Sequence, residues 1–218
     1  NEGTVQGTFR PLKNIMGLWL IQECAHRWRE EGVFPGWDGL AKLAQAETPF
    51  HSVIDPDWAP FFAPGNMQEK IRAYCRQTGQ PEPETQGQFA RCVYESLALK
   101  TRFSLCALES ILGRRIDTLH LVGGAAKSRL LCRMTADAAE RPVLTGPEEA
   151  ACVGNLLMQL KALGKLRTPE EARELVRRSF PLRLLQPHPS PSWRDAYSRL
   201  LEYRRRMENE KEIVSDGQ

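Results

Sequence analysis

The sequence has no long hydrophobic run, and this absence already narrows the class of protein. No stretch reaches the roughly 18 uncharged apolar residues of a membrane-spanning helix, and no secretory signal pattern opens the chain. A charge excess of one sign is also missing, because 30 Lys and Arg face 27 Asp and Glu in 218 residues. A nucleic-acid-binding protein would usually concentrate more positive charge. We therefore expect a cytoplasmic protein that has neither a membrane nor a nucleic acid as its partner.

Metal and thiol motifs are missing as well. The six cysteines, at positions 24, 75, 92, 106, 132 and 152, form no Cys-x-x-Cys pair, and the four histidines have no ligand spacing. This pattern excludes a zinc ribbon and a thioredoxin-type redox site, so we predict no metal site. Six cysteines in a chain of this length predict buried, reduced thiols and not a disulfide scaffold. His120 lies in an apolar segment and is expected in the core.

What is present is enough apolar material for a packed core and a clear helical pattern in the first half. Apolar residues make up 41% of the chain, which suits one large domain or two small ones. Helices are predicted over residues 11–31, 36–47, 66–79 and 86–112. Asn66 and Thr85 are suitable N-caps, and Gly79 and Gly113 suit the C-terminal ends. The last of these helices is apolar over most of its surface, which predicts a central position.

The second half alternates strands and helices. Strands are predicted over 116–122 and 142–144, and helices over 127–139, 148–163, 169–179 and, beyond a proline-rich connection, 193–210. This order predicts an α/β layer structure with a small sheet flanked by helices. The helix after 148 begins with small residues, which predict close packing on a neighbouring element: Ala150, Ala151, Cys152 and Gly154.

A pair of glycines joins the first of these strands to its helix. Gly123 and Gly124 allow a tight turn and leave room for a ligand to approach the backbone. A helix start adds free N–H donors and the positive end of a dipole, so the turn suits a nucleotide phosphate or ribose. The segment matches neither GxGxxG nor GxxxxGK[ST]. The local pattern therefore also permits an ordinary tight turn that binds no ligand.

A set of short segments distributed along the chain carries a resemblance: Asn-Glu-Gly at 1–3, Leu-Lys-Asn-Ile-Met-Gly-Leu-Trp at 12–19, Gln-Glu at 22–23, Cys-Arg-Gln-Thr-Gly-Gln-Pro at 75–81, Arg-Cys at 91–92, Glu-Ser-Leu-Ala-Leu-Lys at 95–100, His-Leu-Val-Gly-Gly at 120–124, Ala-Asp-Ala at 136–138, Arg-Pro-Val at 141–143 and Gly-Pro-Glu-Glu-Ala at 146–150. Taken together, these segments resemble the C-terminal domain of the FGGY family of carbohydrate kinases, and within it the rhamnulokinases. The likeness covers about residues 1–185, and the segment at 12–19 favours rhamnulokinases over glycerol or xylulose kinases.

The resemblance implies the C-terminal domain of an actin/Hsp70/hexokinase-like (ribonuclease H-like) ATPase fold. Residues 1–185 would form this nucleotide-side domain, and residues 186–218 a helix and polar tail packed on it. The implied reaction transfers the γ-phosphoryl group of ATP, with Mg²⁺, to O1 of L-rhamnulose or a related ketose. The implied partner is an N-terminal kinase domain that carries the phosphate loop and an aspartate base. Because this chain starts with Asn and has no Gly-His-Asp segment, we expect a piece of a longer product, without a catalytic residue and inactive alone.

The resemblance also assigns site residues. Asn14 matches a sugar-contacting asparagine, while Gln22 and Gly124, with Gly123 beside it, match ATP-contacting positions. Eight residues separate the two amides, so a helix over 11–31 would place both on one face, although an ordinary polar surface residue at position 14 is left open.

The resemblance extends to Cys75 and Cys92, because rhamnulokinases carry a pair of cysteines at these two positions. In those proteins the pair can form a disulfide bond. Such a bond would close a loop of about 17 residues and contribute roughly 3 kcal/mol. Two reduced thiols in contact are the alternative.

One departure from the family pattern bears on function. The family usually has Gly-Gly-Gly-small-x-Asn after the strand, where this chain has Ala125 and Ser128. If the third glycine needs a positive φ, alanine there costs about 1 kcal/mol or more and loosens the nucleotide loop. A non-catalytic nucleotide-binding or regulatory module of the actin/Hsp70 superfamily is therefore the alternative function. The arginine runs at 177–178 and 204–206 are interspersed with glutamates, which disfavours an interaction module built on them.

Overall fold

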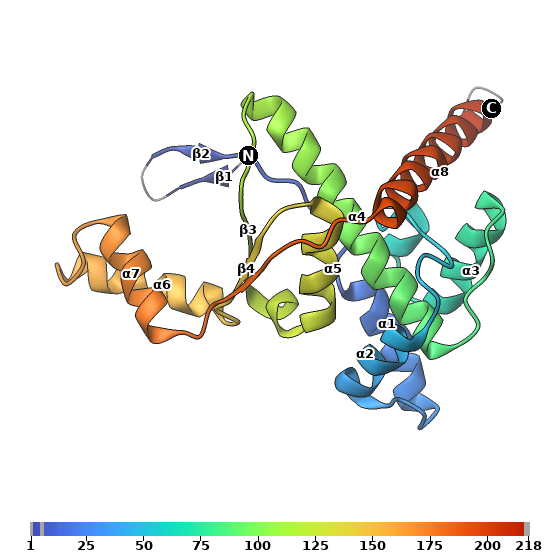
Figure 1. Cartoon of the computed structure of the whole chain (residues 1–218), viewed down its shortest axis with the longest axis horizontal. Helices are drawn as coiled ribbons and strands as arrows, with labels where there is room; N and C mark the ends of the chain where they lie inside the picture. The colour runs from blue at the N-terminus through green and yellow to red at the C-terminus, as the bar shows by residue number, and fades with distance from the viewer. Residues whose placement is uncertain (1, 5–6, 216–218) are drawn as a thin grey trace.

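The computed structural model describes residues 2–4 and 7–215, with side chains up to residue 208 (Figure 1). Its α-helices are α1 (Trp19–Glu30), α2 (Gly36–Ala46), α3 (Met67–Thr78), α4 (Gln86–Leu112), α5 (Arg129–Ala139), α6 (Ala150–Ala162), α7 (Pro169–Ser179) and α8 (Pro191–Ser215). Its strands are β1 (Glu2–Gly3), β2 (Phe9–Arg10), β3 (Leu119–Leu121), β4 (Val143–Thr145) and β5 (Arg183–Leu185), and 3₁₀ turns cover Ala59–Phe62 and Gly123–Lys127.

A three-stranded sheet lies beside the helical body, with strand order β3-β4-β5. β3 and β4 are parallel, as a strand–helix–strand unit with α5 as its crossover requires, and β5 is antiparallel to β4. This confirms the predicted α/β structure with a small sheet flanked by helices. The expectation for His120 is wrong, because its side chain is exposed on β3, an edge strand whose neighbours Leu119 and Leu121 are half-buried.

Helix α4 runs through the middle of the molecule in Figure 1, as its apolar surface predicted. It begins with a complete capping box, in which the Thr85 hydroxyl accepts from the Gln88 N–H at 3.1 Å and the Gln88 side chain accepts from the Thr85 N–H at 3.4 Å. It ends before Gly113, which adopts the left-handed conformation. Helices α2 and α5 pack along it, and Gly87 lets the end of α2 approach closely.

The segment between α2 and α3 is irregular and held by aromatic rings, as predicted. The indole of Trp58 makes edge contacts with Phe61 and Tyr74, with ring centroids 5.0 and 5.4 Å away. Asn66 then caps α3, its side chain accepting from the Glu69 N–H at 3.1 Å. These contacts fix the part of the loop that leads into α3. Its two aspartates, Asp55 and Asp57, belong to the ion cluster described in the next subsection.

The predicted helix over 11–31 is wrong in its first part, because α1 begins only at Trp19. The chain from residue 11 to residue 17 has no regular structure. Ile15 and Met16 still pack against the core, so their apolar spacing is satisfied without a helix. The backbone N–H of Met16 donates to Asp57 Oδ1 at 3.1 Å, a partner 41 residues away in the sequence.

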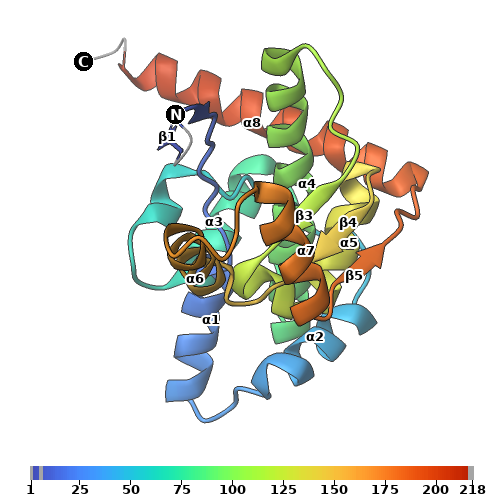
Figure 2. The ribbon, with the colours of Figure 1, turned by 90° about the vertical axis from the view of Figure 1, so that its left-hand side faces the viewer.

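Helices α6 and α7 stand apart from the body, in front of the sheet in Figure 2. No side chain of either helix is buried, and Leu156 and Leu163 are exposed. The close packing predicted for the small residues of α6 is therefore not found among the described residues: Ala151 and Cys152 are exposed. The reason is that α6 and α7 lie together at the left of the molecule in Figure 1, away from the helices around α4.

Helix α8 returns to the body and completes the core. Its Trp193 ring lies 4.7 Å from the ring of Phe50, and Arg199 donates to the Phe50 carbonyl oxygen at 2.8 Å. Ala196 and Leu200 are fully buried in the same cluster as α1 and α4. The described part of residues 186–218 thus packs on the rest of the domain, while residues 216–218 of the predicted polar tail lie outside the described residues. None of the described helices combines the length and apolar character needed to cross a bilayer.

Candidate functional site

The paired glycines lie in a 3₁₀ turn that joins β3 to α5, as predicted for a turn between a strand and a helix. Gly123 has φ +71°, which favours glycine, and its N–H donates to the Pro147 carbonyl oxygen at 3.1 Å. Gly124 is exposed, and a Cβ added there would meet no atom within 4 Å. A ligand therefore has open access to the backbone at Gly124.

Ala125 carries no backbone strain. It is absent from the residues with positive φ, and the left-handed position in the turn falls on Gly123 instead. Ala125 is half-buried, and its methyl packs against the main hydrophobic core. The condition under which alanine would loosen the loop is not met.

Ser128 keeps the capping function that an asparagine would have. Its hydroxyl accepts from the Leu131 N–H at 3.3 Å, so it is the N-cap of α5. Lys127, one residue earlier, points its ammonium at acidic side chains from the start of α6, 3.2 Å from Glu149 Oε1 and 3.9 Å from Glu148 Oε2. These exposed pairs link the turn after β3 to the turn after β4.

Asn14 and Gln22 do not share a helix face, contrary to the prediction. Asn14 is exposed in the irregular segment before α1, and Gln22 is exposed in the first turn of α1. Neither side-chain amide has a hydrogen-bond partner among the described residues, so both have free donors and acceptors. The segments that carry Asn14 and Gly124 border the same core, because Ile15, Met16 and Ala125 all pack against it.

An ion cluster around the buried Lys100 contacts Lys13 and Met16, on either side of Asn14, and sequence reasoning missed it. Lys100 of α4, only 1% exposed, places its Nζ 2.7 Å from Asp55 Oδ1 and 2.9 Å from Asp57 Oδ2. Arg204 of α8 adds its Nε at 3.1 Å from Asp55 Oδ2. The available signal was a lysine inside an apolar helix together with Asp-Pro-Asp in an aromatic loop.

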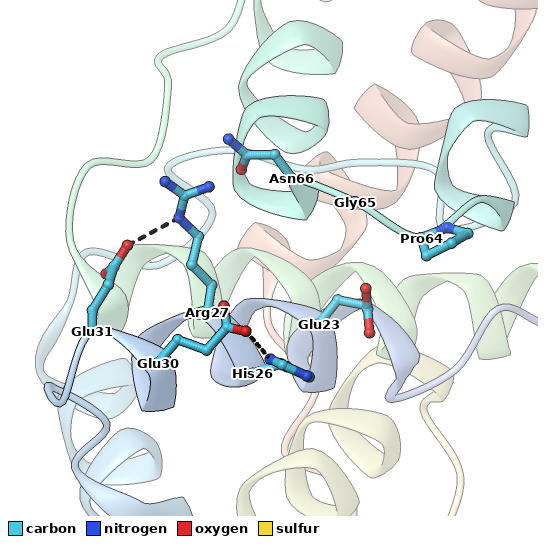
Figure 3. Close-up of a pocket in the computed structure, with 8 residues that line it drawn as sticks. All are labelled: Glu23, His26, Arg27, Glu30, Glu31, Pro64, Gly65 and Asn66. Atoms are coloured by element: carbon cyan, nitrogen blue, oxygen red, sulfur yellow. Dashed lines mark hydrogen bonds and ion pairs between the residues drawn. The ribbon is translucent and has the colours of Figure 1, made fainter.

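The pocket drawn in Figure 3 contains none of the predicted site residues. It has a volume of about 510 Å³ and lies between α1 and the segment before α3. Its lining residues are Glu23, His26, Arg27, Glu30, Glu31, Pro64, Gly65 and Asn66. Arg27 is paired with Glu31 at 3.0 Å, and His26 lies 3.5 Å from Glu30. Three carboxylates against one paired guanidinium make this pocket unsuited to a triphosphate.

Among the described residues, no group of three or more His, Cys, Asp or Glu side chains is arranged to hold a metal ion. Mg²⁺ usually takes one or two carboxylates and receives its other ligands from substrate phosphates and water, so this finding concerns a preformed metal site and not magnesium bound with a nucleotide.

Cys75 and Cys92 are free, buried thiols in this structure. Burial raises the pKa of Cys75 to about 12, and burial together with the nearby Cys75 raises the pKa of Cys92. The two thiols are thus close enough to affect each other, and the disulfide between them stays a prediction. Cys24 and Cys132 are buried too, whereas Cys106 and Cys152 are exposed, so the expectation of buried thiols is wrong for these two.

Solved structures share this fold. The xylulose kinase from Rhodospirillum rubrum aligns with a TM-score of 0.56 and 21% identity, over 90% of this chain and 38% of that one. The Plasmodium falciparum glycerol kinase, solved with ADP, aligns with a TM-score of 0.59 and 12% identity, over 86% of this chain and 37% of that one. At these identities the likeness shows the fold alone. The fold is thus that of one part of an actin/hexokinase-like sugar kinase.

The sequence assigns the family more closely. Residues 1–163 match the C-terminal domain of the FGGY family of carbohydrate kinases, and the chain belongs to this family. It is 42% identical to a rhamnulokinase of Bacteroides thetaiotaomicron over 90% of this chain, and 45% identical to one of Enterococcus faecalis over 88%. A rhamnulokinase of Bacillus subtilis is 38% identical over 86% of the chain. The chain spans about 40% of the length of these curated relatives.

Proposed function

We propose that the chain is the C-terminal, ATP-side domain of a cytoplasmic kinase that phosphorylates O1 of L-rhamnulose or a closely related ketose. The observation that carries this proposal is the 38–45% identity to three rhamnulokinases over 86–90% of the chain. The family match over residues 1–163 includes Asn14, Gln22 and Gly124.

The open glycine turn supports a nucleotide contact. At Gly124 no Cβ fills the space above the backbone, so a phosphate or ribose of ATP approaches closely there. The free amide of Gln22 would donate to and accept from the same nucleotide. The free amide of Asn14 would bind a sugar hydroxyl, to which it offers both a donor and an acceptor.

In the proposed reaction the O1 hydroxyl of the ketose attacks the γ-phosphorus of ATP. The bond from that phosphorus to the β–γ bridging oxygen breaks, and ADP leaves. The hydroxyl proton passes to an aspartate of the N-terminal kinase domain, because this chain has no Gly-His-Asp segment. Mg²⁺ bound with ATP would neutralise charge on the phosphates, and this domain contributes positioning.

The alternative, a nucleotide-binding or regulatory module without catalysis, rested on the changes at Ala125 and Ser128. Ala125 has no positive φ, and Ser128 still caps α5. Neither change therefore disables the turn, and we favour the kinase.

A chimera tests the proposal. The segment of the Bacteroides thetaiotaomicron relative that aligns with this chain is replaced by the whole 218-residue chain, and ATP-dependent phosphorylation of L-rhamnulose is measured. We expect activity from the chimera and none from this chain alone, which has no base. The relative's N-terminal part alone is the control. An expressed, folded chimera that binds ATP but phosphorylates none of L-rhamnulose, L-fuculose and D-xylulose would refute the ketose kinase and favour the non-catalytic module.

A further inference from the structure

The ion cluster near Asn14 fixes two carboxylates of one loop around a buried ammonium group. The Lys100 ammonium is 1% exposed, and its two carboxylates come from one short loop segment, Asp55-Pro56-Asp57. The Asp57 N–H donates to Asp55 Oδ1 at 3.1 Å, so the two aspartates also fix each other. A buried ammonium between two carboxylates has one favourable geometry, because any displacement leaves a charge unpaired in a poorly solvated place.

Asp57 connects the ion cluster to the segment that contains Asn14. Its Oδ1 accepts the Met16 N–H at 3.1 Å, and its Oδ2 lies 3.8 Å from the Lys13 ammonium as well as 2.9 Å from that of Lys100. One carboxylate thus holds residues 13 and 16, which flank Asn14 on both sides.

The segment around Asn14 depends on these contacts with Asp57 for a fixed conformation. Residues 11–17 have no helix or strand hydrogen bonds, and Asn14 itself is exposed. A flexible segment would lose affinity through the entropy of ordering the amide each time a ligand binds. A segment that is already held presents its amide at a fixed point.

We propose that Asp57 is a positioning residue for the sugar site: through Met16 and Lys13 it fixes the backbone that presents Asn14 to the ketose. This inference rests on the proposed function of Asn14. Lys100 orients the Asp57 carboxylate, whereas Arg204 pairs with Asp55 and Glu208 and makes no contact with Asp57.

The first test measures these contacts of Asp57 without any sugar. Amide hydrogen exchange of Met16 is followed by NMR in the 218-residue chain and in its variants. D57A removes the acceptor, and we expect the Met16 amide to exchange at least 10-fold faster. D57N keeps an oxygen acceptor in place and should restore most of the protection. R204A is the matched control, because it disturbs the same cluster but touches none of the Asp57 contacts, and it should leave Met16 protected. An unchanged Met16 amide in D57A would overturn the inference.

The second test measures the effect on sugar in the chimera. We expect D57A to raise the ketose KM about 10-fold, with kcat and the KM for ATP within twofold of the parent, and D57N to recover most of this change. R204A should leave all three constants unchanged, and an equal rise of the ketose KM in R204A would show a structural effect only. If Asn14→Ala leaves the ketose KM unchanged, the proposed role of Asn14 fails. If Asn14→Ala raises it and D57A does not, the positioning by Asp57 fails.

Discussion

Replacing Lys100 with methionine gives a quantitative test of the buried ion cluster. Methionine keeps most of the side-chain volume but removes the ammonium that contacts Asp55 Oδ1 at 2.7 Å and Asp57 Oδ2 at 2.9 Å. Asp55 keeps Arg204 at 3.1 Å, whereas Asp57 keeps only Lys13 at 3.8 Å and the Met16 N–H. Breaking a buried pair and leaving the partner charged costs about 3–5 kcal/mol. Because both aspartates are partly exposed and each keeps another cation nearby, we expect a loss at the lower end of this range, about 3 kcal/mol at pH 7, measured by urea denaturation.

The dependence of this loss on pH follows from the pKa of Asp57. Burial alone would raise this pKa, but the hydrogen bonds from Lys100 and Met16 and the charge of Lys13 hold it below its ordinary value. The ionised carboxylate thus stabilises the fold above about pH 3.9, and this contribution disappears as the pH falls through the lowered folded-state pKa. In the Lys100→Met variant Asp57 is protonated more readily, so the difference in stability from the wild type should shrink between pH 7 and pH 4.

Lys42→Met on the exposed side of α2 is the matched control, because Lys42 has no charged partner among the described residues. Its free energy of unfolding should stay within about 0.5 kcal/mol of the wild type. A loss below about 1 kcal/mol for Lys100→Met at pH 7, or a loss that is the same at pH 4, would refute the conclusion that Lys100 stabilises the fold by pairing with the two ionised aspartates.

Three further outcomes are expected. Gly87→Ala should lower the free energy of unfolding by about 1–3 kcal/mol in chemical denaturation, because its Cβ would lie 2.8–2.9 Å from atoms at the end of α2. Gly154→Ala is the control and should not destabilise the fold, because a Cβ at Gly154 would have no other atom within 4 Å. Gly124→Val should weaken ATP binding at least 10-fold in a nucleotide titration while the melting temperature changes little, since its side chain meets only open space; unchanged ATP affinity would remove Gly124 from the site. Mass spectrometry of the non-reduced protein should show a Cys75–Cys92 bridge after mild oxidation, and two free thiols at these positions after that treatment would refute the bridge.

Those parts of the fold that depend on neighbours in sequence could be predicted. The start of α4 at its Thr85 capping box, its end at Gly113 and the Asn66 cap of α3 all lie where the sequence placed them. Each of these signals acts within one helical turn, so no distant contact is needed to set it.

Features set by distant contacts could not be predicted in this way. The helix expected from residue 11 fails because the Met16 N–H finds its partner on Asp57, and Ile15 fills the core from an irregular segment. Strand β5 was missed because it exists only through its pairing with β4. At the glycine turn the type of loop was predicted, but not which residue takes the positive φ, and that difference decides whether Ala125 is strained.

The return of α8 to the first half of the chain bears on how this domain is made. Phe50 receives its partners Arg199 and Trp193 from about 145 residues later, so that length of chain must follow Phe50 before its surface is covered. Until then the aromatic loop and the aspartates of the ion cluster lack part of their final surroundings, and a nascent chain in this condition exposes apolar surface of the kind that chaperones bind. A truncation before α8 would therefore leave an unfinished domain, and not merely a shorter one, because α8 covers a surface that the earlier helices of this domain leave open.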